Sequence, residues 1–219
     1  MSHLRLHTFL LCGVCGMIGS TLSAADAELV TRDLFISFDS QPTDFAFTAK
    51  SNVGTTTGDD AFDSGLGISV GGRWSFTQSG SSLGLVIGGD LDVTSYQYEN
   101  SAENLTFGAR LIVGAGWAIS DRWELLLEPT IEYGVASFTF PATQSYAAYE
   151  ADGTFFGYGL RLNAIHRFTD RWAVMGALGW KRIDNDLSGD GIDLTLEQEG
   201  VSISIGLLYR LSAAPARVE

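Results

Sequence analysis

The chain contains little cysteine, little proline and little histidine. Its 219 residues include two cysteines, Cys12 and Cys15, four prolines and three histidines. Both cysteines lie in a segment that we expect to be removed, so the mature protein has neither disulfide nor thiol chemistry. The chain after residue 25 also lacks a run of about 18 apolar residues, which excludes a transmembrane helix there.

The first residues have the features of a secretory signal peptide. Arg5 lies in a short polar start, residues 8–19 form an apolar run, and residues 20–25 are mostly small. The run is too short for a membrane helix, and small residues before a cleavage site are typical of export signals. We predict a signal peptide at 1–25, cleaved after Ala24 or Ala25, and therefore an exported protein.

The charge balance is strongly acidic. The sequence has 13 lysines and arginines against 26 aspartates and glutamates, a net charge of −13. Removal of the signal peptide takes away Arg5 alone among the charged residues and leaves 12 − 26 = −14. This excess argues against nucleic acid as a partner. An exported, acidic, cysteine-free chain with 26 glycines suits a β-protein of the Gram-negative outer membrane, or a secreted soluble barrel.

The segment 104–138 carries the clearest structural pattern. Between Leu105 and Ile119 every second residue is apolar, and most residues between them are small or charged. After a break at 120–122, the alternation resumes from Trp123 to Val135. A period of two indicates strands. Two long strands with one apolar face, one small and charged face and a tight turn are typical of a transmembrane β-hairpin.

The same alternation predicts about eight strands. They are expected within 32–47 and at 65–76, 83–96, 105–119, 123–135, 155–168, 172–183 and 194–211. Three short connections alternate with four longer, acidic ones. We therefore predict an all-β protein, a closed antiparallel up-and-down transmembrane barrel at 26–211 with a short tail at 212–219. Its short turns should face the periplasm and its longer loops the exterior.

Tryptophans gather near the short turns. Four of the five lie within about six residues of such a turn on the apolar face of their strands, and we interpret them as an interfacial girdle. These are Trp74, Trp117, Trp123 and Trp172. The alternative is a secreted lipocalin-like binder, in which the apolar face would point inward. The opposite face is rich in glycine and serine, which suits the cramped interior of a narrow barrel and favours lipid outside.

The inward face carries both signs of charge. Ten residues form this predicted interior network: Arg73, Asp90, Asp92, Arg110, Glu124, Glu128, Glu132, Arg161, Lys181 and Arg210. Buried charges must be paired. On adjacent strands we expect Arg73 beside Asp90, Arg110 beside Asp92 and Glu128, and Arg161 beside Glu128 or Glu132. We interpret the network as an ionic plug that closes the interior. The alternative function, a small passive pore, needs an unpaired, wet lumen.

Taken together, these features resemble the OmpA/OmpX-type eight-stranded outer-membrane barrels. Ser204, Gly206, Tyr209 and Leu211 match the polar–x–Gly–x–x–aromatic–x–hydrophobic signal that the barrel-assembly machinery reads in such proteins. The chain departs from the family in running on through 212–219. The resemblance implies a monomer anchored among outer-membrane lipids and lipopolysaccharide, with a role in surface interaction or envelope integrity. It implies no cofactor.

Candidate catalytic and metal-binding groups are few. A lipid A-modifying enzyme needs serine, histidine and an acid together. His166 is the only histidine of the mature chain and lies at a turn end on the lipid side, so we expect no enzyme. Segment 184–190 resembles the start of a calcium loop, but Thr195 stands where a glutamate is needed. We interpret it, and the acidic residues of 59–63, as solvated turns rather than metal sites.

Pro129 does not fit the strand pattern. It lies in the middle of the fifth predicted strand, and every strand of a closed barrel is a central one. Proline there removes a ladder hydrogen bond. A local bulge is one way to accommodate it.

Overall fold

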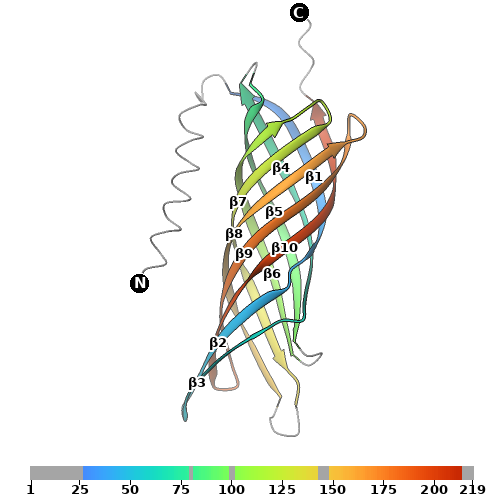
Figure 1. Ribbon diagram of the computed structural model, residues 1–219. Coiled ribbons are helices and arrows are strands. Elements are labelled where there is room, and N and C mark those ends of the chain that lie inside the picture. The colour runs from blue at the N-terminus through green and yellow to red at the C-terminus, as the bar shows by residue number, and fades with distance from the viewer. Residues whose placement is uncertain (1–26, 79–80, 99–101, 143–147, 214–219) are drawn as a thin grey trace, which may run out of the picture.

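The computed structural model describes residues 27–78, 81–98, 102–142 and 148–213, and the predicted signal peptide lies outside them. The described regular structure consists of ten β-strands, drawn in Figure 1. They are β1 (Ala27–Ser40), β2 (Thr43–Ser51), β3 (Gly54–Ala61), β4 (Ser64–Gln78), β5 (Leu83–Tyr98), β6 (Ala102–Ala118), β7 (Trp123–Phe140), β8 (Tyr149–Arg167), β9 (Trp172–Gly189) and β10 (Ile192–Ala213). Among the described residues, no helix is long and apolar enough to cross a membrane.

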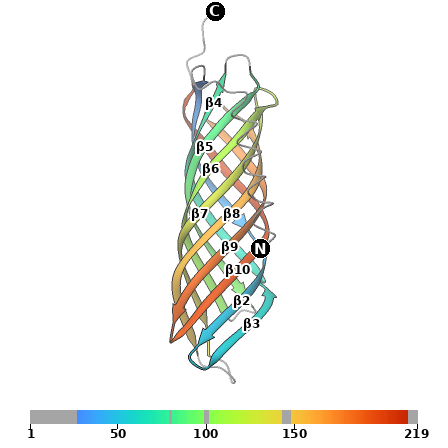
Figure 2. The same ribbon diagram turned by 90° about the vertical axis from the view of Figure 1, so that its left-hand side faces the viewer.

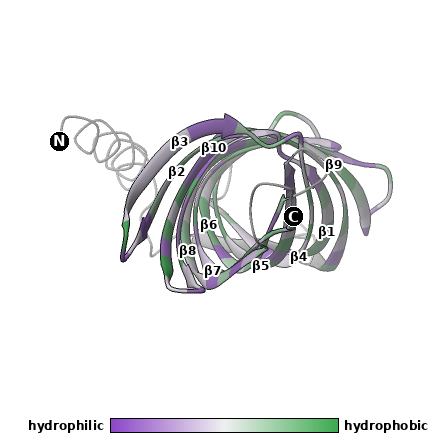
Figure 3. Cartoon of the chain, turned by 90° about the horizontal axis from the view of Figure 1, so that it is seen from below, coloured by the Kyte–Doolittle hydropathy of each residue, from purple (hydrophilic) through white to green (hydrophobic). Residues whose placement is uncertain are grey.

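The strands form a closed antiparallel barrel, as predicted. The order is β1-β4-β5-β6-β7-β8-β9-β10-β2-β3, and pairing of β1 with β10 closes the ring of β1 and β4–β10. Figure 2 shows the strands winding obliquely around a tall cylinder, and Figure 3 looks along it. In a closed ring, the strands hydrogen-bond each other's backbone N–H and C=O groups. A β-sheet must meet this condition to span a membrane.

The described residues form ten strands, and the prediction of about eight was wrong. The segment 32–47, predicted as one strand, contains the end of β1 and the start of β2, separated by Gln41 and Pro42. The predicted loop that follows contains β3, which pairs with β2. The first half of β10 pairs with β2 and its second half with β1. The β2–β3 hairpin therefore adds to the wall at one end of the barrel, as Figure 2 shows.

The strands at this end also extend further than predicted. The segment 184–191, predicted as a loop, is mostly the end of β9, and a two-residue turn of Asp190 and Gly191 leads into β10. Both turn residues have positive φ, 49° and 77°. An Asp-Gly pair with two positive φ values is the preferred two-residue hairpin turn, because its twist matches that of the strands. The calcium-loop alternative therefore has no loop on which to form.

Pro129 is accommodated without a bulge. The β6–β7 ladder reaches Ile112 opposite Thr130 and resumes with Ala115 opposite Leu127 in unchanged register. Two rungs are missing because Pro129 has no N–H to donate. Gly114 lies in this gap, and a Cβ there would collide with the Leu127 carbonyl oxygen. The register shifts lie in β1 instead. One interrupts its pairing with β4, between Leu29 and Thr31, and the other interrupts its pairing with β10, between Arg32 and Asp33.

An apolar band surrounds the outside of the barrel. On β10 it runs from Val201 to Leu211, close to the 9–11 residues with which a tilted strand crosses a bilayer. We call the end of the barrel that carries the β4–β5, β6–β7 and β8–β9 connections the turn end. The predicted girdle tryptophans Trp74, Trp117, Trp123 and Trp172 are all exposed there. Trp180 marks the other margin of the band, where its Nε1 donates to Glu199 Oε1 at 3.1 Å. The apolar face thus points outward, toward lipid.

This band predicts a depth-dependent cost for charge. Ile205 and Ile119 are both 62% exposed, but Ile205 lies near the middle of the band on β10 and Ile119 lies beside the short turn at 120–122. Ile205→Arg should destabilise the barrel by roughly 2–4 kcal/mol and Ile119→Arg by about 0–1 kcal/mol. Denaturant titrations of refolding into lipid vesicles measure both. Equal costs would show that the band does not face the membrane.

Candidate functional site

The barrel interior is built in layers. Two buried apolar clusters lie toward its two ends, and charged residues lie between them. The turn-end cluster consists of Phe35, Val86, Ile112, Leu126, Ile165, Ala173, Met175 and Leu208. The cluster toward the opposite end, which we call the outer cluster, consists of Phe62, Tyr96, Ala136, Ala151, Phe155, Ile183, Leu187, Leu194 and Leu196. We call the charged zone between them the ionic layer.

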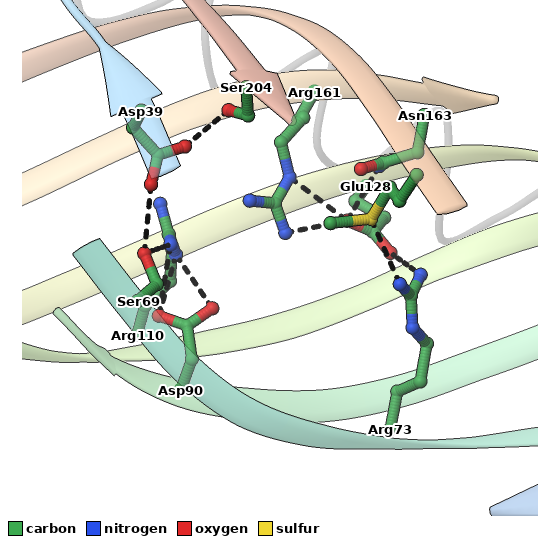
Figure 4. Close-up of polar contacts among 10 residues, drawn as sticks. Asp39, Ser69, Arg73, Asp90, Arg110, Glu128, Arg161, Asn163 and Ser204 are labelled. Carbon is green, nitrogen blue, oxygen red and sulfur yellow. Dashed lines mark hydrogen bonds and ion pairs between the residues drawn. The ribbon is translucent and has the colours of Figure 1, made fainter. Parts of the chain in front are cut away.

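Glu128, on β7, is the centre of one half of the ionic layer. Its Oε2 accepts from Arg161 Nη2 at 2.9 Å and Nε at 3.1 Å, and from Asn163 Nδ2 at 2.8 Å. Its Oε1 accepts from Arg73 Nη1 at 3.1 Å. The Glu128 side chain is fully buried. Figure 4 shows the two guanidinium groups converging on this carboxylate, so one acid is shared by two bases.

Arg73 reaches Glu128 from the other side of the ring. It is on β4, and its Nη2 donates to Met175 Sδ at 3.0 Å while its Cζ lies 5.2 Å from the Phe35 ring centroid. The head group therefore rests on the turn-end cluster, with a cation–π contact. The expected pairing of Arg73 with Asp90 was wrong, because a narrow interior lets a long arginine cross the lumen instead of contacting the next strand.

Arg110 forms the other half of the layer with Asp90. Its Nε donates to Asp90 Oδ1 at 3.0 Å and to Oδ2 at 3.1 Å, and its Nη2 donates to Ser69 Oγ at 3.0 Å. Ser69 Oγ in turn donates to Asp39 Oδ2 at 3.0 Å, and Ser204 Oγ donates to the other oxygen of Asp39. Asp39 thus joins β1 to both of its neighbours, β4 and β10 (Figure 4). Asp90, rather than the expected Asp92 and Glu128, is the carboxylate paired with Arg110.

The remaining predicted residues fall into two further groups. Lys181 Nζ lies 2.7 Å from Glu132 Oε2, and Asp92 is buried, accepting from Thr94 Oγ1 at 3.3 Å.

At the turn end, Asp33 is shared by two bases. Arg167 Nη2 lies 2.9 Å from Asp33 Oδ2 and 3.4 Å from Glu124 Oε2, and Arg210 Nε lies 3.4 Å from Asp33 Oδ1. All ten predicted network residues therefore point into the barrel, while three charged residues were missed: Asp33, Asp39 and Arg167. The alternation of Asp33, Ser37 and Asp39 with apolar residues was the signal that could have found the first two.

The interior leaves little free space. A cavity of about 20 Å³ lies in the ionic layer, with room for about one water molecule. A larger hollow of about 380 Å³ opens at the turn end, where Val86 of the turn-end cluster is among its lining residues. This hollow, which we call the turn-end mouth, meets the turn-end cluster at its base. Packed apolar residues thus lie on both sides of the ionic layer.

The other candidate groups do not assemble a reactive site. His166 packs against the Trp123 ring, with centroids 4.5 Å apart. Asp60, predicted in a solvated loop, lies on β3 and accepts from Tyr98 Oη at 2.6 Å, which lowers the pKa of its carboxyl group. Among the described residues, no group of three histidine, cysteine, aspartate or glutamate side chains is placed to hold a metal ion.

The residues of the predicted assembly signal lie on β10. Ser204 bonds to Asp39 inside the barrel, and Gly206 lies against β1. Tyr209 packs on Trp172 with centroids 4.9 Å apart, and Leu211 is exposed on the outer band. β10 continues to Ala213, so it extends two residues into the predicted tail.

A ring-closed antiparallel sheet with an apolar outer band and a charged interior defines a transmembrane β-barrel of the outer-membrane type. The chain belongs to the MipA family: the family's sequence profile, described as MltA-interacting protein MipA, matches residues 18–210. The narrower resemblance to OmpA/OmpX-type barrels is not confirmed. No curated protein sequence matches the chain.

Several solved structures are similar in fold. Neisserial surface protein A is 13% identical, with 81% of this chain and 97% of that chain covered and a TM-score of 0.43. The outer membrane protease OmpT from Escherichia coli is 12% identical, with 87% and 99% covered and a TM-score of 0.46. The outer membrane protein OprG from Pseudomonas aeruginosa is 12% identical, with 85% and 98% covered and a TM-score of 0.42. Similarity at this level assigns no activity.

The geometry of Glu128 predicts a large stability effect. Glu128→Gln leaves Arg73 and Arg161 buried without a carboxylate, which should cost about 3–5 kcal/mol. Glu197→Gln is the matched control, because it removes an exposed carboxylate 2.6 Å from Arg182 Nη2 and should cost about 0–1 kcal/mol. Equilibrium unfolding in vesicles compares the two variants. Similar costs would mean that Glu128 does not hold the layer together.

Proposed function

We propose that this protein is a non-conducting outer-membrane scaffold that is anchored among lipids and lipopolysaccharide and presents its ends to other proteins. The observation that carries the proposal is the layered interior. A pore needs a continuous wet lumen, whereas here an ionic layer with room for about one water molecule lies between two apolar clusters. If no ions or solutes pass through the interior, the function of the protein lies on its surfaces.

An enzymatic role has little support. Catalysis by a nucleophile needs a base within hydrogen-bond reach and a third group that orients it. His166 is directed to the outer face against Trp123, and the serines Ser69 and Ser204 donate to Asp39 inside the packed layer. We therefore assign the interior polar residues to holding the barrel together.

Family membership suggests the partner. The MipA family is described by an interaction with MltA, and we propose that this chain binds an MltA-type protein. An exported, membrane-anchored scaffold needs a partner that reaches one of its ends. The barrel alone is proposed to be a monomer, because its ring is already closed and leaves only the β2–β3 hairpin with a free edge in the described sheet.

Planar-bilayer recordings test the closed interior. The purified mature protein should give no stable conductance steps. Arg110→Ala should remain closed as well, because the apolar clusters on both sides of the ionic layer are intact in this variant. A slower migration of the boiled protein than of the unboiled one on a detergent gel would verify that each sample is a folded barrel. Stable, ion-selective steps from the unaltered protein would favour the alternative function, a small pore.

Partner binding is tested separately. The barrel in lipid nanodiscs should retain the MltA homologue of the same bacterium in a pull-down, and empty nanodiscs should not. Absence of retention by a folded barrel would remove the MltA-type partner from the proposal.

A further inference from the structure

The turn-end mouth has the form of a binding pocket. It has a volume of about 380 Å³ and lies among the turns that are expected to face the periplasm. Its lining includes Thr31 and Ser75 on neighbouring strands β1 and β4, and Glu124, Arg167 and Arg210 from three further strands. Because the turn-end cluster lies beneath it, the mouth is a blind hollow rather than the entrance to a channel.

The mouth contains hydrogen-bonding groups without partners. Within the described part of the chain, Thr31 Oγ1 and Arg167 Nη1 are buried and bond to nothing. Thr31 is 6% exposed and lies in the lining of the mouth. A buried polar atom without a partner costs about 1–3 kcal/mol, and such atoms in a native structure call for an explanation. A ligand in the mouth would supply the missing partner.

The charges identify the ligand. Asp33 lies beneath the mouth, where its oxygens already bind Arg167 and Arg210, and Glu124 binds Arg167. The carboxylates of Asp33 and Glu124 are therefore occupied, while Arg167 keeps one guanidinium nitrogen free. Arg122 adds a third base to the lining, beside Asp121. A free guanidinium nitrogen suits a carboxylate, with which arginine makes short, charge-assisted hydrogen bonds.

We infer that the turn-end mouth binds an acidic peptide segment of a periplasmic partner, with a carboxylate accepting from Arg167 and Arg210. This inference rests on the proposed function, since it gives the partner a point of attachment on the barrel.

A single cysteine reports on occupancy of the mouth. Both cysteines of the chain lie in the predicted signal peptide, so Ser75→Cys places one thiol in the pocket of an otherwise cysteine-free barrel. Ser188→Cys, on the exposed end of β9, is the matched control at the opposite end. The rate of modification by N-ethylmaleimide is measured on the mature barrel in nanodiscs, with a blocked Ala-Glu-Ala-Glu-Ala peptide or its glutamine counterpart.

The glutamate peptide should slow modification of Ser75→Cys, the glutamine peptide should not, and neither should affect Ser188→Cys. Adding Arg210→Gln should raise the half-protecting peptide concentration about tenfold, the effect of one charge-assisted hydrogen bond. Arg182→Gln, at the outer end, should leave it unchanged. Arg210→Lys keeps the positive charge but loses the planar guanidinium group, so it should also raise the half-protecting peptide concentration. This variant tests the same contact if Arg210→Gln does not fold.

Three results would overturn the inference: no protection at saturating peptide, equal protection by the glutamine peptide, or protection by inorganic phosphate as strong as by the glutamate peptide. The last would make the mouth a small-anion site. These measurements use the barrel alone. If they fail while the barrel still retains the MltA homologue, the partner docks elsewhere. If they succeed while that homologue is not retained, the pocket stands and the proposed partner fails.

Discussion

A charge inside a closed barrel in a membrane has to find its counter-charge within the same ring of strands. Water is scarce in the narrow interior, so each unpaired ion would carry a desolvation cost of several kcal/mol. The barrel meets this constraint by gathering most of its buried ions in one layer, where Glu128 is shared by two arginines and Asp90 pairs with a third. A second group lies at the turn end, where Asp33 is shared by Arg167 and Arg210. The two apolar clusters strengthen the ion pairs between them, because they exclude the water that would screen these charges.

The outer face and the wall of the barrel follow from period-two alternation, and they were predictable from sequence. The alternation around Leu105 and Ile119 sets which residues meet lipid, and the structure has the same register. The strand count was not predictable in the same way. Gln41 and Pro42 interrupt the first strand between two apolar alternations, so the sequence resembles one strand where the fold has two. Polar β3, with its threonines and aspartates, has no apolar face to reveal it.

The interior residues were predictable as a set but not as pairs. Alternation shows that Arg73 and Arg110 point inward, and strand order shows their neighbours. It does not show that an arginine on β4 bridges the lumen to Glu128 on β7, because that depends on the barrel's diameter and on the length of the side chain. The missed Asp33 and Asp39 lie on β1, the strand whose position was least defined by the sequence.

The shared use of β10 has a consequence for how the barrel forms. Its 22 residues pair with β9 on one side and with both β1 and β2 on the other. The bond between Ser204 and Asp39 joins positions 165 residues apart. Such contacts impose a high loop-closure entropy before they contribute any stability, which slows folding. Until the last strand is in place, the first two have one open edge and Asp39 lacks one of its two hydroxyl donors. Pairing of β10 with β1 and β2 is therefore the natural final step of assembly. A chain that lacks β10 cannot close the ring and stays an open sheet.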